Sequence, residues 1–537
     1  MKLLSILIFI PFLGMLLIGV LPKVYQNIYK YITAGIALIQ VLLAVYLYAN
    51  FEKNAVFQFI EQQNWISLQI GSLGKLQIDY FVGMDGISAG LVLLSSIVML
   101  IASLSSFEIK SNLKGYFILF NLMNLAIMGV FLSLDFFLFY VFYELMLLPL
   151  YFLIGMWGGS NREYASIKFF LYTLFGSVFM LLIMVGLYFS VNDPSTGNHT
   201  FNILHMMNLA NYKADGFFSH ASNVMLFGIP SRFIAFIVLF IGFAIKVPMV
   251  PFHTWLPDAH VEAPTPISIV LAGILLKVGA YGIIRICYGI FPDAAIHYSY
   301  YIGLMGMISI IYGALNALSA KDLKRLIAYS SVSHMGFVLI GIASLTAEGM
   351  NGAIFQLFSH GILSSMLFFL VGVLYFRVHD RELANFRGLS LQMPKYTVFV
   401  VIAFFASLGL PGMSGFIGEA FSLFGAFLSE TSNGMIPRWM AVVSTLGILL
   451  GAAYFLWALQ RMFFGEKRFK LSSWENQLTD LTTREYIVLI PLALSTIILG
   501  IFPSYLFDWS NASVNVLIND TLMNGYIYLH QYFQVIG

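Results

Sequence analysis

The chain has 537 residues, of which 60% are hydrophobic and only 10% are charged, and its mean hydropathy is +0.87. The chain has too few polar side chains to cover a water-soluble globule of this size. The composition therefore excludes a soluble domain and indicates an integral membrane protein. The net charge of +2 and the scattered cations argue against nucleic-acid binding, and the single Cys287 excludes an internal disulfide and an iron–sulfur cluster.

Apolar windows of about 19 residues predict an all-α, polytopic protein with fourteen transmembrane helices in one membrane domain, residues 1–537. The first apolar segment lacks a small-residue cleavage site and is expected to be retained. The polar segments 50–83 and 191–231 are expected as loops, the first with a short hairpin. The tail, 507–537, contains no full span and is expected to lie on the surface or a partner, or to be a loosely packed terminus. The expected spans lie near 3–21, 28–49, 84–105, 115–133, 136–156, 165–190, 232–249, 263–287, 299–319, 325–345, 351–376, 396–428, 438–460 and 485–506.

Positive charge is distributed unevenly between the two sets of loops that these helices define. Of the 27 Lys and Arg residues, 18 fall on one side and 6 on the other, while Lys246, Lys277 and Arg285 lie within or at the ends of helices. The positive-inside rule therefore predicts that both termini face outward.

Two of the predicted helices contain helix-breaking residues. The seventh carries Pro248 and Pro251 just after Lys246, and the twelfth contains SLGLPGMSGFIGEAF, with Pro411 and Gly412 among regularly spaced glycines. Both helices are expected to be discontinuous. Because they are five helices apart, helices 4–8 (about 115–287) and 9–13 (about 299–460) are expected to form two inverted five-helix repeats with ion sites near mid-membrane.

Isolated charges mark the candidate functional residues. Glu144, Lys277 and Glu419 are each the only charge in an apolar helix, and Lys246 lies beside a helix break. A charge in the bilayer costs roughly 2.5–3.5 kcal/mol on insertion scales, so four such residues favour an ion path over polar bridges between helices. The sequence contains no motif for metal-dependent hydrolysis or phosphate binding and no convincing pair of haem ligands.

A carboxylate close to Lys246 would make it a switch. Desolvation and an opposite charge about 4 Å away, which is worth about 4 kcal/mol at an effective dielectric of 20, nearly cancel in their effect on a lysine. Movement of Glu144 relative to Lys246 is therefore expected to load or release a proton. His334 and His360 are expected as relays, although a satisfied core histidine is an equally good interpretation. His253, Asp258 and His260 follow the break and are expected to line or cap the inner end.

The motifs on these helices are similar to a known family. KVPMVPFHTWLPDAHVEAPTPISIVLAGILLKVGAYGIIR, YSSVSHMG, FSHGILSSMLFFLVG and SLGLPGMSGFIGE resemble the antiporter-like membrane subunits of proton-pumping NADH:quinone oxidoreductase, respiratory complex I. The resemblance covers nearly all of the fourteen predicted helices. Glu419 stands where sister subunits usually carry a lysine.

The resemblance implies a proton-translocating subunit of a redox-driven translocase. It implies Glu144 and Lys246 as a pair, Lys277 as central relay, His334 and His360 as further relays, and Glu419 as terminal proton site. No cofactor is expected on this chain; NADH, FMN, iron–sulfur clusters and quinone are expected on other subunits, which together with sister antiporter-like subunits would be its partners. A bacterial cytoplasmic (inner) membrane is the expected location. The alternative is a subunit of a multi-subunit cation/proton antiporter, which shares the Glu and Lys of helices five and seven.

Overall fold

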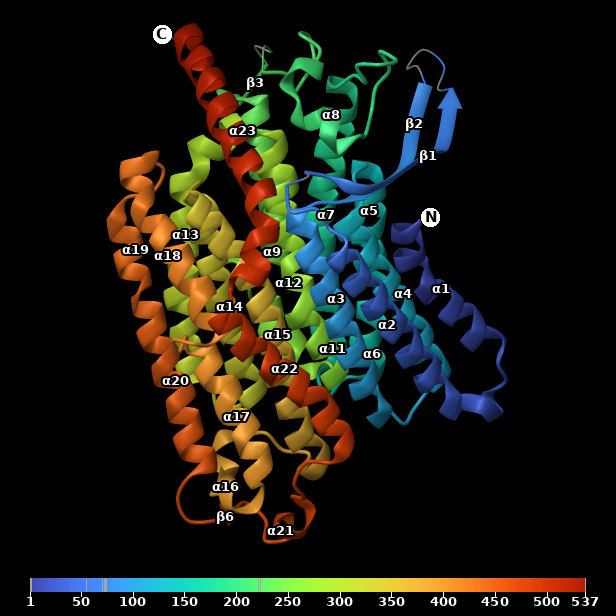
Figure 1. Ribbon diagram of the computed structural model, residues 1–537, viewed down its shortest axis with the longest axis vertical. Coiled ribbons are helices and arrows are strands. Elements are labelled where there is room, and N and C mark those ends of the chain that lie inside the picture. The colour runs from blue at the N-terminus through green and yellow to red at the C-terminus, as the bar shows by residue number, and fades with distance from the viewer. Residues whose placement is uncertain are drawn as a thin grey trace.

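The computed structural model describes residues 2–54, 56–69, 71, 75–220, 222 and 224–536, with side chains to residue 527. It is a helical bundle with a few short strands at its two ends (Figure 1). The helices are α1 Leu3–Val20, α2 Gln26–Ala49, α3 Gly86–Ser105, α4 Leu113–Leu132, α5 Phe136–Leu145, α6 Leu147–Trp157, α7 Arg162–Ser190, α8 Ile203–Met207, α9 Ser231–Lys246, α10 Trp255–Glu262, α11 Thr265–Val270, α12 Leu276–Gly282, α13 Pro292–Ser319, α14 Leu323–Ala343, α15 Ala347–Val378, α16 Leu389–Gln392, α17 Pro394–Ser407, α18 Ser414–Ser432, α19 Arg438–Ser444, α20 Leu446–Phe463, α21 Trp474–Gln477, α22 Thr483–Ile501 and α23 Ser504–Ile536.

Within the described residues, twelve helices are long and apolar enough to cross a membrane. This is two fewer than the fourteen expected, and the difference lies in the predicted seventh and twelfth spans. The seventh, α9, has 16 residues and ends at Lys246. In place of the twelfth stand α17, which has 14 residues, and α18, and neither of the two is both long and apolar enough by itself.

The centre of the bundle is formed by helices that are buried on all sides along their most apolar stretch. These are the span Thr265–Tyr288, which contains α11 and α12, and α15. The first of them is not a regular α-helix, because π-helical segments at Leu271–Leu275 and Ile283–Tyr288 flank α12. A π turn adds a residue to the helix and leaves backbone groups without regular partners, and such turns are frequent at functional sites.

The expected hairpin is confirmed. Strands β1 (Gln58–Gln69) and β2 (Lys75–Met84) pair antiparallel. They lie at the upper end of Figure 1, together with α8 and the strands β3 (Met225–Leu226) and β4 (Ile229–Pro230). The opposite end carries the third strand pair, β5 (Phe386–Arg387) with β6 (Arg468–Phe469). Most of the loop cations lie at this lower end, which we call the cation-rich face.

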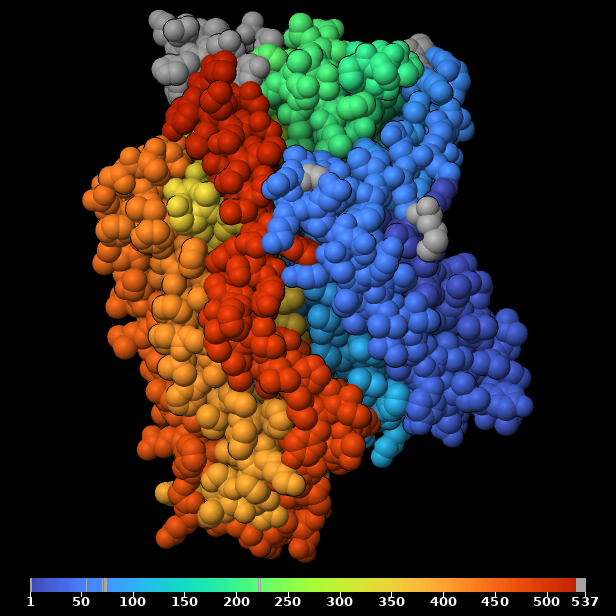
Figure 2. Space-filling model, in the orientation of Figure 1, coloured from blue at the N-terminus to red at the C-terminus, as the bar shows by residue number. Residues whose placement is uncertain are grey.

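The C-terminal tail is a helix and not a loosely packed terminus. The helix α23 packs against α3, α13 and α15, and its Trp509, Val514 and Leu517 are buried. Figure 2 shows α23 in red, lying along the side of the bundle that faces the viewer, between the blue N-terminal part and the orange helices. It is hydrogen bonded to the bundle beneath it, since the Ser510 hydroxyl donates to Asn351 of α15 at 2.6 Å.

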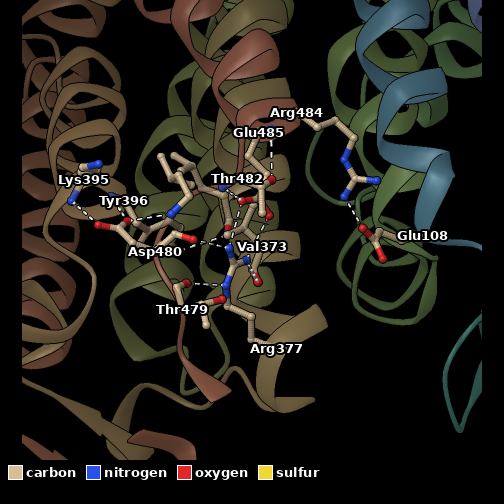
Figure 3. A network of polar contacts seen from close by, with 12 residues as sticks. Glu108, Val373, Arg377, Lys395, Tyr396, Thr479, Asp480, Thr482, Arg484 and Glu485 are labelled. Carbon is tan, nitrogen blue, oxygen red and sulfur yellow. Dashed lines mark hydrogen bonds and ion pairs between the residues drawn. The ribbon is translucent and has the colours of Figure 1, made fainter. Parts of the chain in front are cut away.

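At the cation-rich face, α15, α17 and α22 are joined by a polar cluster that we call the clamp (Figure 3). Arg377, near the end of α15, donates to both carboxylate oxygens of Glu485 at 3.0 and 2.9 Å. Its remaining N–H groups donate to the carbonyls of Val373, Thr479 and Asp480. All five donors of the guanidinium are therefore used. The Asp480 carboxylate accepts from the backbone N–H groups of residues 395 and 396, and Arg484 is paired with Glu108.

Candidate functional site

Lys246 is the last residue of α9, and its side chain is buried. The chain leaves the helix there and enters α10 at Trp255. The indole N–H of Trp255 donates to the Ile245 carbonyl at 2.8 Å, and the N–H of Val250 donates to the Ser309 hydroxyl at 3.1 Å. Backbone groups freed by an interrupted helix need partners in an apolar medium, and side chains provide them here.

The ammonium group of Lys246 lies on the aromatic ring of Tyr143, the residue before Glu144. Its Nζ is 3.3 Å from the ring centroid and 3.5 Å from the Tyr143 carbonyl oxygen. Glu144 Oε1 is buried without a hydrogen-bond partner, and among the described residues no ion pair within 4.0 Å joins Glu144 to Lys246. The two groups are thus neighbours but not in contact, and a cation–π contact holds the lysine.

Glu144 itself lies next to an interruption between α5 and α6. The first of these helices ends at Leu145 and the second begins at Leu147. Pro149 has no N–H and so cannot bond to the carbonyl of Leu145, which is four residues earlier. The carboxylate is therefore carried by a helix end whose local hydrogen bonding is incomplete.

Lys277 is fully buried in α12, directly after the first π-helical segment. Its Nζ donates to the carbonyl of Ala272, within that segment, at 2.6 Å. It also lies 2.7 Å from Nδ1 of His360 on α15. The irregular helix thus supplies a backbone acceptor that fixes the ammonium group against the imidazole.

A chain of polar contacts continues from Lys277 across three helices. His360 contacts the hydroxyl of Ser331 through Nε2 at 3.1 Å, and its ring centroid lies 5.4 Å from that of His334 on α14. His334 Nδ1 is 2.8 Å from Glu419 Oε1 on α18. The structure therefore brings together four of the six residues that the sequence singled out as proton-translocation sites.

A small cavity of about 10 Å³ lies beside the two imidazoles. This is close to the lower limit for one water molecule. Gln356 Oε1 and Ser407 Oγ are buried there without partners. A water in this cavity would find these two groups as partners. The cavity is lined by Ser330, Ser331, His334, Gln356, His360, Leu363, Ser364, Leu367, Ser407 and Gly415.

The segment between α17 and α18 brings the backbone close to Glu419. Gly409 and Gly412, between α17 and α18, have φ of +81° and +90°, a conformation that only glycine adopts easily. A Cβ on Gly409 would lie 3.2 Å from Glu419 Oε2. The non-helical segment that includes Pro411 thus passes directly beside the carboxylate.

Lys246 is not connected to this chain by polar contacts. Between Lys246 and Lys277, α9 and α12 pack through glycines. A Cβ at Gly279 would lie 2.9 Å from the Phe243 carbonyl and 2.8 Å from the Val247 nitrogen, and one at Gly282 would overlap the Phe243 ring. The described contacts therefore divide the site into two parts with an apolar, closely packed segment between them.

The three inner-end candidates are separated by the structure. Asp258 forms ion pairs with Lys168 at 2.8 Å and Arg325 at 3.3 Å at the cation-rich face. The Asp258 carboxylate is thus held between two cations, and its ion pairs join α10 to α7 and α14. His253 packs edge-on against the ring of Tyr312 at 5.0 Å.

His260 lies deeper than the other two candidates. It is fully buried, stacks on Phe368 with the ring centroids 4.5 Å apart, and neither ring nitrogen has a partner. Lys324, one of the 18 cations counted on the cation-rich side, is also buried, and its Nζ donates to the Ala263 carbonyl at 2.6 Å. This burial could not be predicted from the sequence, since Lys324 stands in the charged segment KDLKR.

A carboxyl group at the opposite face, that of Asp135, has a raised pKa. Asp135 caps α5 by accepting from Leu138 N–H at 3.0 Å and also accepts from Asp79 N–H at 3.3 Å. Burial raises the pKa of Asp135 to about 7. Within the described ranges, no three His, Cys, Asp or Glu side chains are grouped as ligands for a metal ion.

Comparison with known proteins gives consistent matches over most of the chain. The family model described as NADH:quinone oxidoreductase/Mrp antiporter, TM, matches residues 133–456. NADH-quinone oxidoreductase subunit M of Rickettsia prowazekii is 39% identical over 524 residues, which are 96% of this chain and 99% of that protein. A chain of respiratory complex I from Thermus thermophilus with bound NADH has a TM-score of 0.80 at 27% identity, covering 96% and 99%. A chain of the Mrp complex from Dietzia sp. has a TM-score of 0.78 at 20% identity over 98% and 100%, which indicates a shared fold.

Proposed function

Because the chain belongs to the NADH:quinone oxidoreductase/Mrp antiporter family, as an antiporter-like membrane subunit M of respiratory complex I, we propose that it moves protons along its buried charges. The observation that carries this proposal is the contact chain from Lys277 through His360 and His334 to Glu419. Subunit M is also called subunit 4. Glu419 favours this subunit because sister subunits usually carry a lysine at that position.

The first part of the route is a switch formed by Glu144 and Lys246. The observed arrangement, with the ammonium on the Tyr143 ring and Glu144 Oε1 unpaired, is its open state. Contact at about 4 Å would stabilise both charges by about 4 kcal/mol at an effective dielectric of 20. Closing the pair holds the proton on Lys246, and opening it in a desolvated site releases the proton.

The second part is a relay. A proton on Lys277 passes to His360, then through a water in the adjoining cavity to His334, and finally to Glu419. Each of these steps joins groups that are already in contact or separated by the space of one water. Transfer from Lys246 to Lys277 requires transient entry of water into the packed segment at Gly279, which is the slowest step of the route.

The driving force comes from elsewhere in the assembly. We infer that quinone reduction in other subunits, which carry NADH, FMN, iron–sulfur clusters and quinone, changes the charge and hydration along this axis. Moving one charge against the membrane potential costs about 2.3 kcal/mol per 100 mV, which is less than the stabilisation assigned to the closed pair.

The architecture proposed for this function is that of two inverted repeats, residues 115–287 and 299–460, in one membrane domain. The supporting observation is that α9 ends at Lys246 and α17 ends shortly before the helix of Glu419. We further propose a bacterial cytoplasmic membrane, with the cation-rich face inside and both termini outside.

The deciding experiment reconstitutes the purified complex in vesicles and follows NADH-driven acidification with a pH-sensitive dye. Lys246→Ala is expected to abolish pumping, and Glu144→Gln is expected to do the same. Lys23→Ala, a cation on the cation-rich face that is exposed in the structure, is the matched control. Unchanged pumping in Lys246→Ala together with poor assembly would mean that this chain is a scaffold only.

Co-purification separates the proposal from its alternative. Partners with flavin and iron–sulfur centres indicate complex I. Small membrane partners without redox centres would instead indicate a cation/proton antiporter, whose solved relative shares the fold at 20% identity.

A further inference from the structure

A large open hollow lies at the cation-rich face, away from the axis described above. It has a volume of about 940 Å³ and lies between the end of α20 and the β5–β6 pair. Because α20 ends at Phe463 and belongs to a membrane-spanning helix, the hollow lies where a span leaves the apolar layer. This is the depth of the phospholipid headgroups.

The hollow is lined by four cations and no carboxylate. These are Arg387, Arg461, Arg468 and Lys470. Of the four, only Lys470 has an acidic partner among the described ion pairs, Asp380 at 3.6 Å. The hollow therefore carries a positive charge that the described part of the chain does not balance.

Two of these arginines face each other. Arg387 on β5 and Arg468 on β6 are directly paired in the antiparallel register, so their side chains leave the same face of the strand pair. Like charges in this position are destabilising. An anion bound between the two guanidinium groups removes the repulsion, and a phosphate group matches their paired N–H donors.

The backbone is shaped to hold Arg387 in this place. Gly465 has φ of +93°, and a Cβ there would lie 2.8 Å from Nε of Arg387. Glycine thus permits both the turn after α20 and the close approach of the guanidinium to it. The cation is positioned by the fold before any ligand arrives.

An apolar strip on α20 leads to the hollow. Leu449 and Leu456 are seven residues apart, which aligns them on one side of α20, and Phe464 directly follows the end of the helix. The three side chains are 67%, 42% and 46% exposed. Trp457 lies at the upper edge of the hollow, with the Arg461 guanidinium 4.6 Å from its ring centroid. An aromatic ring at this depth is typical of the membrane interface.

We propose that this hollow binds the phosphate headgroup of an anionic phospholipid, with Arg387 and Arg468 on the phosphate and the acyl chains along the Leu449, Leu456 and Phe464 strip. The apolar strip favours a lipid over a free phosphate ion. The site does not depend on the proposed proton route, since none of its residues contacts the Lys246 to Glu419 axis.

The test uses the intact complex in vesicles that contain phosphatidylglycerol with a photoactivatable acyl chain. After illumination, the label on residues 446–470 is measured by peptide mass spectrometry. Each of the two arginines is expected to contribute about a factor of five, so Arg387→Gln/Arg468→Gln lowers the affinity roughly 25-fold. Lys23→Gln/Lys110→Gln removes two exposed cations from the same face and leaves the label unchanged.

A second variant keeps the test decisive if the double variant does not assemble. Arg468→Glu places an opposite charge beside Arg387, which stabilises the strand pair but repels phosphate. It is expected to assemble and to lose the label. Equal labelling of wild type and Arg468→Glu overturns the proposal. Displacement of the label by excess inorganic phosphate, or a cross-link to a neighbouring subunit in place of lipid, also overturns it.

Discussion

The clamp at the cation-rich face and the charged axis in the membrane are both buried polar clusters, but their hydrogen bonding differs. In the clamp, Arg377 uses all five donors and pairs with both oxygens of Glu485. On the axis, Lys246 has a carbonyl at 3.5 Å and an aromatic ring as its partners, and Glu144 Oε1 has none.

This difference separates a polar cluster that fixes structure from one that can change state. A fully satisfied network has one arrangement of lowest free energy, and any displacement breaks several bonds at once. In an incompletely satisfied pair, a side chain can move to a new partner without breaking several hydrogen bonds. The alternative arrangements therefore have similar free energies. Incomplete hydrogen bonding around a buried charge is therefore the better guide to proton transfer than burial alone.

The clamp should show the largest effect on stability. Arg377→Ala leaves Glu485 buried without its partner, which costs about 3–5 kcal/mol. We expect loss of the assembled complex on native gels, with normal pumping per complex in whatever assembles. Lys395→Ala is the matched control, because only the backbone N–H of Lys395 takes part in the clamp. An assembled but inactive Arg377→Ala complex would contradict the distinction between the two clusters.

The axis should show the opposite pattern. Lys277→Met keeps the length of the side chain and removes its charge, so we expect pumping to fall at least tenfold, equivalent to about 1.4 kcal/mol in the barrier. The thermal midpoint of the complex should change little, since a buried charge is replaced by an apolar group of similar size. A large fall in that midpoint with normal pumping would assign Lys277 to structure.

A smaller effect is expected at the hydroxyl that supports His360. Ser331→Ala removes the contact to Nε2, and one hydrogen bond is worth about 0.5–1.5 kcal/mol. Pumping should fall by about two- to tenfold. Ser333→Ala is the control, since the Ser333 hydroxyl donates to the Ile310 carbonyl and does not touch the imidazoles. Equal effects of the two variants would remove Ser331 from the relay.

The sequence singled out residues that lie close together, but it overestimated the number of helices long enough to span the membrane. A lone charge in an apolar helix is visible in one dimension, and the structure places Lys277 and Glu419 in one chain of contacts with His334 and His360. Their role in proton transfer stays a prediction. The role of Tyr143 was not predictable, because the contact depends on how α5 packs against α9. Asp258 was likewise assigned to the inner end without its two cation partners, which come from α7 and α14.

For the C-terminal tail, the sequence left a segment along the surface or on a partner and a loosely packed terminus open. The structure favours a segment along the bundle, because Ser510 and Asn511 are matched to Asn351 of α15, and Ser513 accepts from the backbone N–H of Gly86 at the start of α3. A polar pattern does not indicate whether its hydrogen bonds go to water or to other helices.

These bonds have a consequence for how charge can cross the membrane. Because α23 is bonded to α3 on one side and to α15 on the other, these two helices cannot tilt apart without breaking contacts to α23. Carriers of the rocking kind expose one site to each side in turn by such tilting. We therefore expect the helices of this chain to stay in place while protons, waters and single side chains move, as in the opening and closing of the Glu144 and Lys246 pair.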